Sequence, residues 1–305
     1  MVTPQIDAQP LSQSKTETAP MPPTFTAFQP WPEAPSLSEA TLAETLDGGQ
    51  AFRWNLHNGI FEGHWARHVL RLRTTSQGIE LSIPESSSLE ATIEALSEYL
   101  ALSTDFAART DALPWRNDPV LRTAIEAFPG LRILRQPLNE TLFGFLCSST
   151  KQISQIKAIC EAVARDLGEP LPNGSHALPS WARLAEGGEE RLRRAKLGYR
   201  ARYIHQTACF LAENPGYLQS IKDAPTELAR ERLMALHGVG RKIADCVLLF
   251  GAGRLEAFPI DTWVQKILVR AYGLDGWKVN QLLDFAHIHF GPSAGLAQQY
   301  LFAAA

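Results

Sequence analysis

The segment Leu236–Cys246, which reads LHGVGRKIADC, constrains the fold of this chain more than any other stretch. An apolar run ends just before Gly238, and a second helical pattern begins at about Arg241. Gly238 and Gly240 can adopt the positive φ angles that a tight hairpin between two helices requires. The second helix is predicted to have one buried face, formed by apolar residues at helical spacing: Ile243, Val247 and Phe250.

This hairpin has two chemical consequences. The backbone N–H groups of Gly238, Val239 and Gly240 can hold a phosphate without reading the base sequence. Lys242 lies in the first turn of the second helix, where the positive end of the helix dipole favours the neutral, nucleophilic amine. An ordinary turn followed by a solvated lysine fits the same segment, so the segment alone leaves both interpretations open.

Composition limits the fold and the function. With 305 residues, of which 45% are hydrophobic, the chain can form two or three small domains with full cores. No apolar run approaches the ~20 residues of a membrane span. Residues 1–30 are rich in Pro, Gln, Ser and Thr, and we expect them to form a disordered tail. Because the cysteines are widely spaced and the histidines show no ligand spacing, we expect reduced thiols, no metal and no cofactor.

The charge is unevenly distributed. The formal net charge of −3 is unusual for a protein that binds DNA. Residues 1–140 contain 10 Lys and Arg against 17 Asp and Glu, whereas residues 141–305 contain 19 against 15. A local basic patch is what contact with phosphates requires, although a solvated helix face has the same composition. The second part contains such a run of cations with no acid between them: Arg191, Arg193, Arg194, Lys196, Arg200 and Arg202.

The hydrophobic pattern changes along the chain. Apolar and polar residues alternate in four short segments separated by turn residues: 50–55, 60–66, 68–74 and 78–83. This alternation predicts a small antiparallel sheet with one solvent-exposed face. From about residue 89, helical patterns follow one another to residue 304, with Pro- and Gly-rich joins between them. The sequence therefore predicts an α+β protein with an N-terminal sheet and a mostly helical remainder.

Several separate blocks resemble one family, in the order in which that family carries them. They are Gly49-Gln50 with Phe52-Arg53-Trp54, Glu140–Ser149, Leu197–Tyr203, Leu236–Cys246 with Pro259-Ile260-Asp261, and Gly291–Phe302. Together they are similar to the 8-oxoguanine DNA glycosylases of the helix–hairpin–helix superfamily. The resemblance implies an antiparallel-sheet glycosylase domain at residues 31–137 and a helical catalytic domain, called HhH-GPD, at residues 138–305.

The resemblance also implies a function. Enzymes of this family excise 8-oxoguanine from duplex DNA in base-excision repair through a lysine Schiff base, and then cleave the strand by β-elimination. We therefore expect double-stranded DNA containing a damaged base as the partner, no membrane contact and a monomer. The expected location is the cytoplasm, at the nucleoid, if the source is bacterial, and the nucleus if it is eukaryotic.

Two residues carry the reaction in this interpretation. Cleavage of an N-glycosidic bond passes through an oxocarbenium-like transition state, which needs a nucleophile or a negative charge at the sugar. By resemblance Lys242 attacks the sugar, and Asp261 stabilises its positive charge. Asp261 also suits the N-cap of the helix that follows it. Asp245, three residues after Lys242, is a rival carboxylate that the chemistry alone does not exclude.

The remaining site residues are assigned by resemblance to the base. Cys246, one helical turn after Lys242, and Pro259 line the base pocket, although a small core residue explains Cys246 equally well. Phe302 stacks on the extruded base. Gln298 offers an amide donor and acceptor to its edge, and the carbonyl of Gly49 accepts the hydrogen that 8-oxoguanine carries at N7.

Other residues are assigned to the duplex, and here the chain departs from the family. By resemblance Tyr199 wedges into the duplex, and Arg200 contacts the cytosine opposite the lesion. Thr150 stands where the family has an Asn that reads this cytosine, and Trp263 stands where it has a phosphate-binding His. We therefore expect weaker discrimination for cytosine opposite the lesion.

Two rival functions stay open at this point. A monofunctional glycosylase for alkylated or other damaged bases would use Asp261 alone, but this leaves Lys242 without a task. A non-catalytic helix–hairpin–helix module would bind DNA through the same hairpin. It gives no reason for Lys242, Asp261, Gln298 and Phe302 to occur together.

Overall fold

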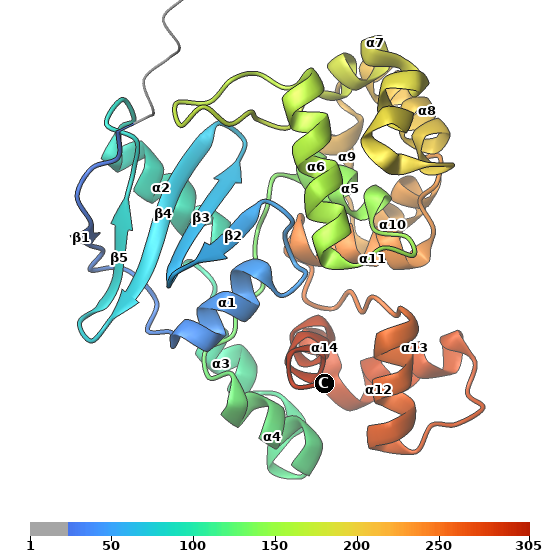
Figure 1. The fold of residues 1–305 in the computed structure, drawn as a ribbon. Coiled ribbons are helices and arrows are strands. Elements are labelled where there is room, and N and C mark those ends of the chain that lie inside the picture. Colours follow the sequence, from blue (N-terminus) through green and yellow to red (C-terminus); the bar gives the residue numbers. More distant parts are fainter. Residues whose placement is uncertain (1–23) are drawn as a thin grey trace, which may run out of the picture.

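The computed structural model describes residues 24–305, which form an antiparallel sheet on one side and an assembly of helices on the other (Figure 1). The spatial order of the strands is β1-β5-β4-β3-β2. The strands are β1 (Gln29–Pro30), β2 (Trp54–His57), β3 (Ile60–Trp65), β4 (His68–Thr75) and β5 (Gly78–Ser82). The predicted α+β class is confirmed.

The alternation of side chains decides which face of the sheet is buried. Leu72 of β4 is fully buried in a core shared with α1 (Glu39–Asp47) and α2 (Leu89–Tyr99). The neighbouring Arg71 lies on the opposite face, where it pairs with Glu62 of β3 at 2.8 Å. These two residues are direct cross-strand partners, so the ion pair supports the register of β3 and β4.

The N-terminal tail is shorter than the disordered stretch predicted at residues 1–30. Residues 1–23 lie outside the described residues. From residue 24 onward the chain joins the sheet, because Phe25 bridges to Pro84 and β1 pairs with β5. The prediction is therefore wrong for residues 24–30. Their partners lie far along the chain, where a local composition pattern does not reveal them.

Helices make up most of the chain after the sheet. They are α3 (Phe106–Asp111), α4 (Pro119–Ala127), α5 (Leu138–Cys147), α6 (Ile153–Leu167), α7 (Trp181–Leu192), α8 (Arg200–Glu213), α9 (Tyr217–Asp223), α10 (Thr226–Met234), α11 (Arg241–Phe250), α12 (Thr262–Tyr272), α13 (Val279–Phe290) and α14 (Ala294–Ala303). The sequence predicts two helices at 180–185 and 188–196. The structure has α7, which is kinked at Gly188, followed by a π-helical turn at Arg193–Leu197.

Two large hydrophobic cores and one small cluster around Val69 stabilise the described part of the chain. One large core lies between the sheet and helices α1 and α2, and the other fills the helical part. Helices α3 and α4 contribute to the helical core, although they precede the domain boundary predicted between residues 137 and 138. The hydroxyl of Thr110 in α3 lies 3.2 Å from that of Tyr300 in α14. The boundary stays a prediction, and residues on its N-terminal side complete the helical core.

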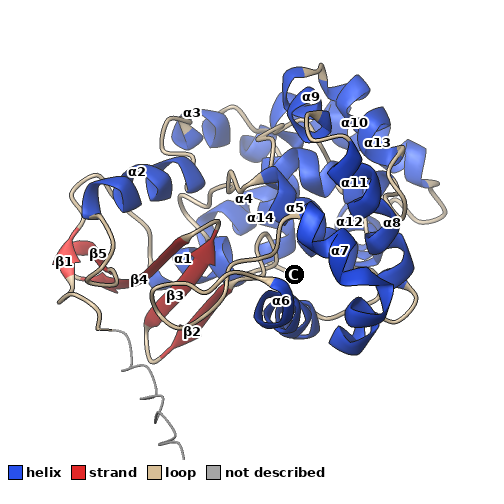
Figure 2. Ribbon diagram, turned by 90° about the horizontal axis from the view of Figure 1, so that it is seen from above, coloured by secondary structure: helices blue, strands red, loops and turns tan. Residues whose placement is uncertain are grey.

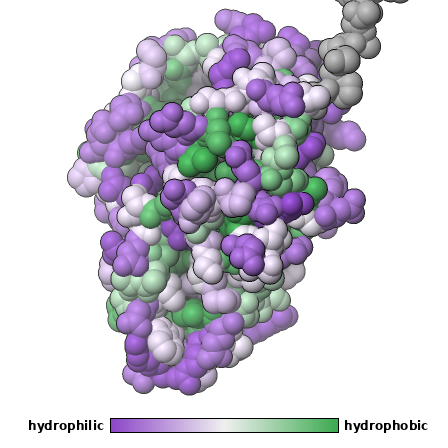
Figure 3. Space-filling model, turned by 90° about the vertical axis from the view of Figure 1, so that its left-hand side faces the viewer, coloured by the Kyte–Doolittle hydropathy of each residue, from purple (hydrophilic) through white to green (hydrophobic). Residues whose placement is uncertain are grey.

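The two parts meet along α6. In both ribbon views α6 is the element of the helical part that lies beside the β2 edge of the sheet (Figures 1 and 2). On the sheet side of the molecule, hydrophilic residues cover most of the surface and apolar groups form small separate patches (Figure 3). In the part of the chain that the structure describes, no helix is both long enough and apolar enough to cross a membrane.

Candidate active site

A cavity of about 420 Å³ lies where the loop between α1 and β2 faces α11, α12 and α14. Its wall contains every residue that the sequence assigns to catalysis or to the base: Gly49, Lys242, Cys246, Pro259, Asp261, Gln298 and Phe302. Segments far apart in the chain thus form one cavity. The structure brings the predicted residues together, and their roles in the reaction remain proposals.

The Lys242 side chain reaches this cavity without a carboxylate partner. Helix α11 begins at Arg241, with Gly240 as its N-cap, so Lys242 lies in the first turn as predicted. Its Nζ lies 3.4 Å from Oγ of Ser148 and 5.3 Å from the centre of the Phe145 ring. Within residues 24–305 the amine forms no ion pair. It is therefore free to act as a nucleophile once it is deprotonated.

Asp261 caps α12 with one of its two carboxylate oxygens. Oδ1 accepts hydrogen bonds from the backbone N–H groups of Trp263 and Val264, both at 2.9 Å. The cap does not use Oδ2. Asp261 and Lys242 both line the cavity, so the carboxylate and the amine lie in the same wall. Asp261 can therefore cap α12 and also stabilise a positive charge in the cavity.

The rival carboxylate, Asp245, points away from the cavity. It is 1% exposed and accepts a hydrogen bond from Nε of Arg230 at 2.6 Å. Nε of Arg241 lies 3.6 Å from its other oxygen. Burial raises the pKa of Asp245, and the two arginines counteract the rise. This buried pair ties α10 to α11, so Asp245 has a structural partner and does not line the cavity.

Gly49 and Phe302 form one wall of the cavity. Gly49 has a φ of 111°, and a Cβ placed there would lie 3.2 Å from Ile153 and 3.9 Å from the Phe302 ring. A flat group can approach the backbone here only because the residue has no side chain. Gln298 is 6% exposed, and its Oε1 is buried without a hydrogen-bond partner in the described chain. Such an unpaired acceptor is costly unless a ligand supplies a donor.

Cys246 contributes a neutral group to the wall. Burial raises the pKa of its thiol to about 11, and the nearby Lys242 amine acts in the opposite direction. The thiol is therefore protonated at neutral pH, which makes it a poor nucleophile. Among the described residues, no three His, Cys, Asp or Glu side chains cluster in a way that would hold a metal ion.

The hairpin has the predicted shape, with one correction. Gly238 has a φ of 79°, and a Cβ there would lie 2.8 Å from Cβ of Tyr203, so the turn requires glycine. Gly240 was also expected to have a positive φ, but its φ is −92° and its backbone is extended. An added Cβ at Gly240 would meet no atom within 4 Å. Val239 is buried between them, and Gly240 borders open space that a phosphate can enter.

Tyr199, Arg200 and Thr150, which the sequence assigns to the duplex, do not line the cavity. Tyr199 is 56% exposed, and Cζ of Arg200 lies 4.5 Å from the centre of its ring. Arg200 itself is buried, which the sequence does not indicate. Its Nη2 donates to Oγ1 of Thr150 at 2.7 Å and to the carbonyl of Ser149. Thr150 has a φ of 54°, which is unusual for a β-branched residue. Their contacts with DNA stay predictions.

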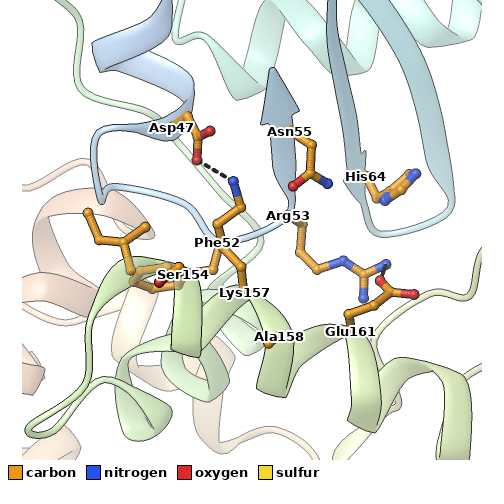
Figure 4. A pocket seen from close by; sticks show the side chains of 10 residues that line it. Asp47, Phe52, Arg53, Asn55, His64, Ser154, Lys157, Ala158 and Glu161 are labelled. Carbon is orange, nitrogen blue, oxygen red and sulfur yellow. Dashed lines mark hydrogen bonds and ion pairs between the residues drawn. The ribbon is translucent and has the colours of Figure 1, made fainter. Parts of the chain in front are cut away.

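A second, more polar pocket of about 790 Å³ adjoins the cavity and shares Phe52, Ile153 and Ser154 with it (Figure 4). Nζ of Lys157 in α6 lies 2.6 Å from Oδ1 of Asp47 in α1. Arg53 lies 3.7 Å from Glu161, also in α6. These pairs join α6 to the segment that carries Gly49, and so help to fix the cavity wall.

Several side chains of the cavity had no assigned role in the sequence. Ser148 and Phe145, which contact Lys242, lie in the block Glu140–Ser149 that supported the family resemblance, but the pattern gave them no role. Ile153 packs beside Gly49, and Gln299 lines the cavity next to Gln298. The adjacency of two glutamines was a signal in the sequence, although it did not show that both face the same cavity.

Comparison with known proteins agrees with this geometry. Residues 34–142 match the family described as 8-oxoguanine DNA glycosylase, N-terminal domain. Residues 143–285 match the HhH-GPD superfamily of base excision DNA repair proteins. The chain is 32% identical over 284 residues to the N-glycosylase/DNA lyase OGG1 of Arabidopsis thaliana, which covers 88% of this chain and 78% of that protein. It is also 32% identical over 267 residues to the N-glycosylase/DNA lyase of Saccharomyces cerevisiae, covering 79% of this chain and 70% of that protein.

Solved structures share the fold. The 8-oxoguanine glycosylase/lyase of Clostridium acetobutylicum in its apo form aligns with a TM-score of 0.80 at 30% identity, covering 87% of this chain and 92% of that one. A 3-methyladenine DNA glycosylase from Archaeoglobus fulgidus, at 19% identity and a TM-score of 0.69, has a similar fold. Fold and site therefore define a helix–hairpin–helix DNA glycosylase. Within that class, the chain belongs to the 8-oxoguanine DNA glycosylase family of bifunctional N-glycosylase/DNA lyases.

Proposed function

We propose that this protein removes 8-oxoguanine from duplex DNA and then cleaves the strand at the abasic site, as a monomer and without a cofactor. One observation carries the proposal. The Lys242 amine has no ion-pair partner among the described residues and reaches a cavity that Asp261 also lines. The volume of about 420 Å³ is in the ordinary range for a small-molecule pocket. The compartment would be the one that holds the DNA, the bacterial cytoplasm or the eukaryotic nucleus.

The reaction begins with an extruded nucleotide. The lone pair of the neutral Lys242 amine forms a bond to C1′ of the sugar, and the electrons of the C1′–N9 bond leave with the base, which takes up a proton. Asp261 stabilises the positive charge that develops on the sugar. The sugar ring then opens to a protonated Schiff base between Lys242 and C1′. Loss of a C2′ proton expels the 3′ phosphate and breaks the strand.

Selection of the base is assigned to the wall formed by Gly49, Gln298 and Phe302. A ring stacked on Phe302 brings its edge near the Gly49 backbone, where a Cβ would otherwise interfere. An oxidised purine carries an N–H at N7 that guanine lacks, and the Gly49 carbonyl can accept it. The unpaired Oε1 of Gln298 offers a further acceptor for a base N–H. Cys246 and Pro259 complete the wall.

Contacts with the duplex are assigned to the hairpin and to the exposed aromatic residue beside it. The N–H groups of Gly238 and Gly240 would hold a phosphate, whereas that of Val239, also expected to do so, already donates to the carbonyl of Leu236 at 3.2 Å. Tyr199 would enter the helix at the vacated position. Thr150 offers a hydroxyl in place of an amide to the base opposite the lesion, and it already accepts from Arg200. We propose that this arrangement reads cytosine weakly.

The rival monofunctional function is tested by separating base release from strand cleavage. The substrate is a labelled duplex with one 8-oxoguanine opposite cytosine, and matched duplexes carry guanine or 3-methyladenine. The proposal predicts a nick at 8-oxoguanine before alkali is added, and no nick at guanine. A nick that appears only after alkali would reject the lyase step. Release of 3-methyladenine in place of 8-oxoguanine would reject the substrate.

A further inference from the structure

The last turn of α1 contains two acidic residues, just before the glycines that border the cavity. Glu44 and Asp47 lie in this turn, which contains no basic residue, and the negative end of the helix dipole disfavours carboxylates there. Lys157 compensates Asp47 (Figure 4). Glu44 has no ion pair among the described residues, and its Oε1 is buried without a hydrogen bond. A carboxyl at the negative end of a helix that no cation compensates points to a functional role for Glu44.

The Glu44 carboxyl lies over Gly48, next to the cavity. A Cβ placed on Gly48 would collide with this carboxyl and with the Glu44 backbone carbonyl. Burial, helped by Asp47, raises the pKa of Glu44 to about 7, and the amide of Gln299 acts against the rise. An amide favours a carboxylate when it presents an N–H group to it, so the Gln299 amide lies near the Glu44 carboxyl.

Gln299 belongs to the wall of the cavity. It follows Gln298 on α14, is 2% exposed, and lines the cavity. Its Nε2 is buried and, like Oε1 of Glu44, has no hydrogen bond of normal geometry in the described chain. A hydrogen bond from Nε2 to Glu44 would leave Oε1 of the planar amide on the side of the cavity. The family resemblance assigns no role to this residue.

We propose that Gln299 contacts the extruded base and contributes to its selection, and that Glu44 is a positioning residue that orients the Gln299 amide. This inference rests on the proposed function, because it requires a damaged purine in the cavity. An acceptor oxygen reads N–H groups, and an oxidised purine offers one more of them than the parent base. Gln298 and Gln299 then read the base from successive positions on one helix.

The test compares binding to two duplexes in a Lys242→Gln background, which prevents turnover. One duplex carries 8-oxoguanine opposite cytosine, and the other carries a tetrahydrofuran abasic analogue that has no base to read. Gln299→Leu and Glu44→Gln should each weaken binding to the lesion duplex by about three- to tenfold and leave binding to the abasic duplex unchanged. Glu39→Gln, an exposed change in the first turn of α1, should alter neither.

The double variant tests whether Glu44 acts through Gln299. If Glu44 acts through Gln299, the double variant should bind the lesion duplex no more weakly than Gln299→Leu alone. Additive losses would overturn the positioning role. Equal losses on both duplexes would show a structural effect and overturn the contact with the base, and so would unchanged binding to the lesion duplex. A parent protein that binds 8-oxoguanine and guanine duplexes equally would reject the proposed function itself.

Discussion

Substitution of Asp261 separates its two roles, because asparagine can keep the helix cap while it removes the charge. In Asp261→Asn the side-chain oxygen can still accept from the N–H groups of Trp263 and Val264, which now bond to Oδ1 at 2.9 Å. Asp261→Ala loses both bonds. The alanine variant should therefore lose about 1 kcal/mol of unfolding free energy, which lowers Tm by about 2 °C in a chain of this size. The asparagine variant should stay within about 0.5 kcal/mol of the parent.

Activity should not follow stability in this pair. Both variants remove the negative charge that stabilises the developing sugar cation, so each should lose about 10²- to 10³-fold in single-turnover excision. The assay is excision of 8-oxoguanine under enzyme excess, together with thermal unfolding of the same preparations. If Asp261→Asn keeps more than a tenth of the parent rate, the charge has no such role. If only Asp261→Ala is inactive, Asp261 acts as a cap and nothing more.

Three further predictions concern the hairpin, Glu140 and Thr150. Gly238→Ala should lower the free energy of unfolding by about 1–3 kcal/mol, because the φ of Gly238 is 79° and the new Cβ would meet Tyr203. Gly240→Ala should be nearly neutral in thermal unfolding. Equal effects of the two substitutions would contradict the hairpin geometry. Burial raises the pKa of Glu140 to about 7, so the folded state retains a proton that the unfolded chain loses near pH 4.5. Its contribution to the free energy of unfolding, ~2 kcal/mol, is lost as the pH rises from about 4.5 through 7. Glu140→Gln should remove this slope from denaturant titrations at several pH values, and a slope that persists would exclude Glu140 as its source. Excision opposite C, A, G and T should differ little in the parent, and Thr150→Asn should raise the preference for C; a strong preference for C in the parent would refute the role given to Thr150.

The parts of the fold that depend on local patterns could be predicted. The alternation in the strands, the hairpin at Gly238 and the first-turn position of Lys242 all follow from properties of neighbouring residues. Gly240 was predicted incorrectly because a glycine permits a positive φ without requiring it. Residues 24–30 were predicted to be disordered because their strand partner lies in β5, far along the chain.

In the candidate site, too, some features could be predicted from the sequence and others depend on contacts between distant segments. Family resemblance placed Lys242 and Asp261, but it did not show that Asp245 would be neutralised by Arg230, a residue of a different helix. Burial of Arg200 against Thr150 was also not predictable, because residue type and spacing do not reveal which way a long side chain turns. The proximity of Glu44 to Gln299 brings α1 near α14, so it depends on how the two parts of the chain pack.

The most direct test of the account is borohydride trapping on a duplex with one 8-oxoguanine opposite cytosine. Reduction converts a Schiff base between Lys242 and the sugar into a stable covalent bond. The account predicts a protein–DNA adduct in the parent protein and none in Lys242→Gln, with both proteins equally folded by thermal unfolding. An adduct that persists in Lys242→Gln would show that another amine reacts. Base release by the parent without any adduct would contradict the lyase mechanism and leave a monofunctional enzyme.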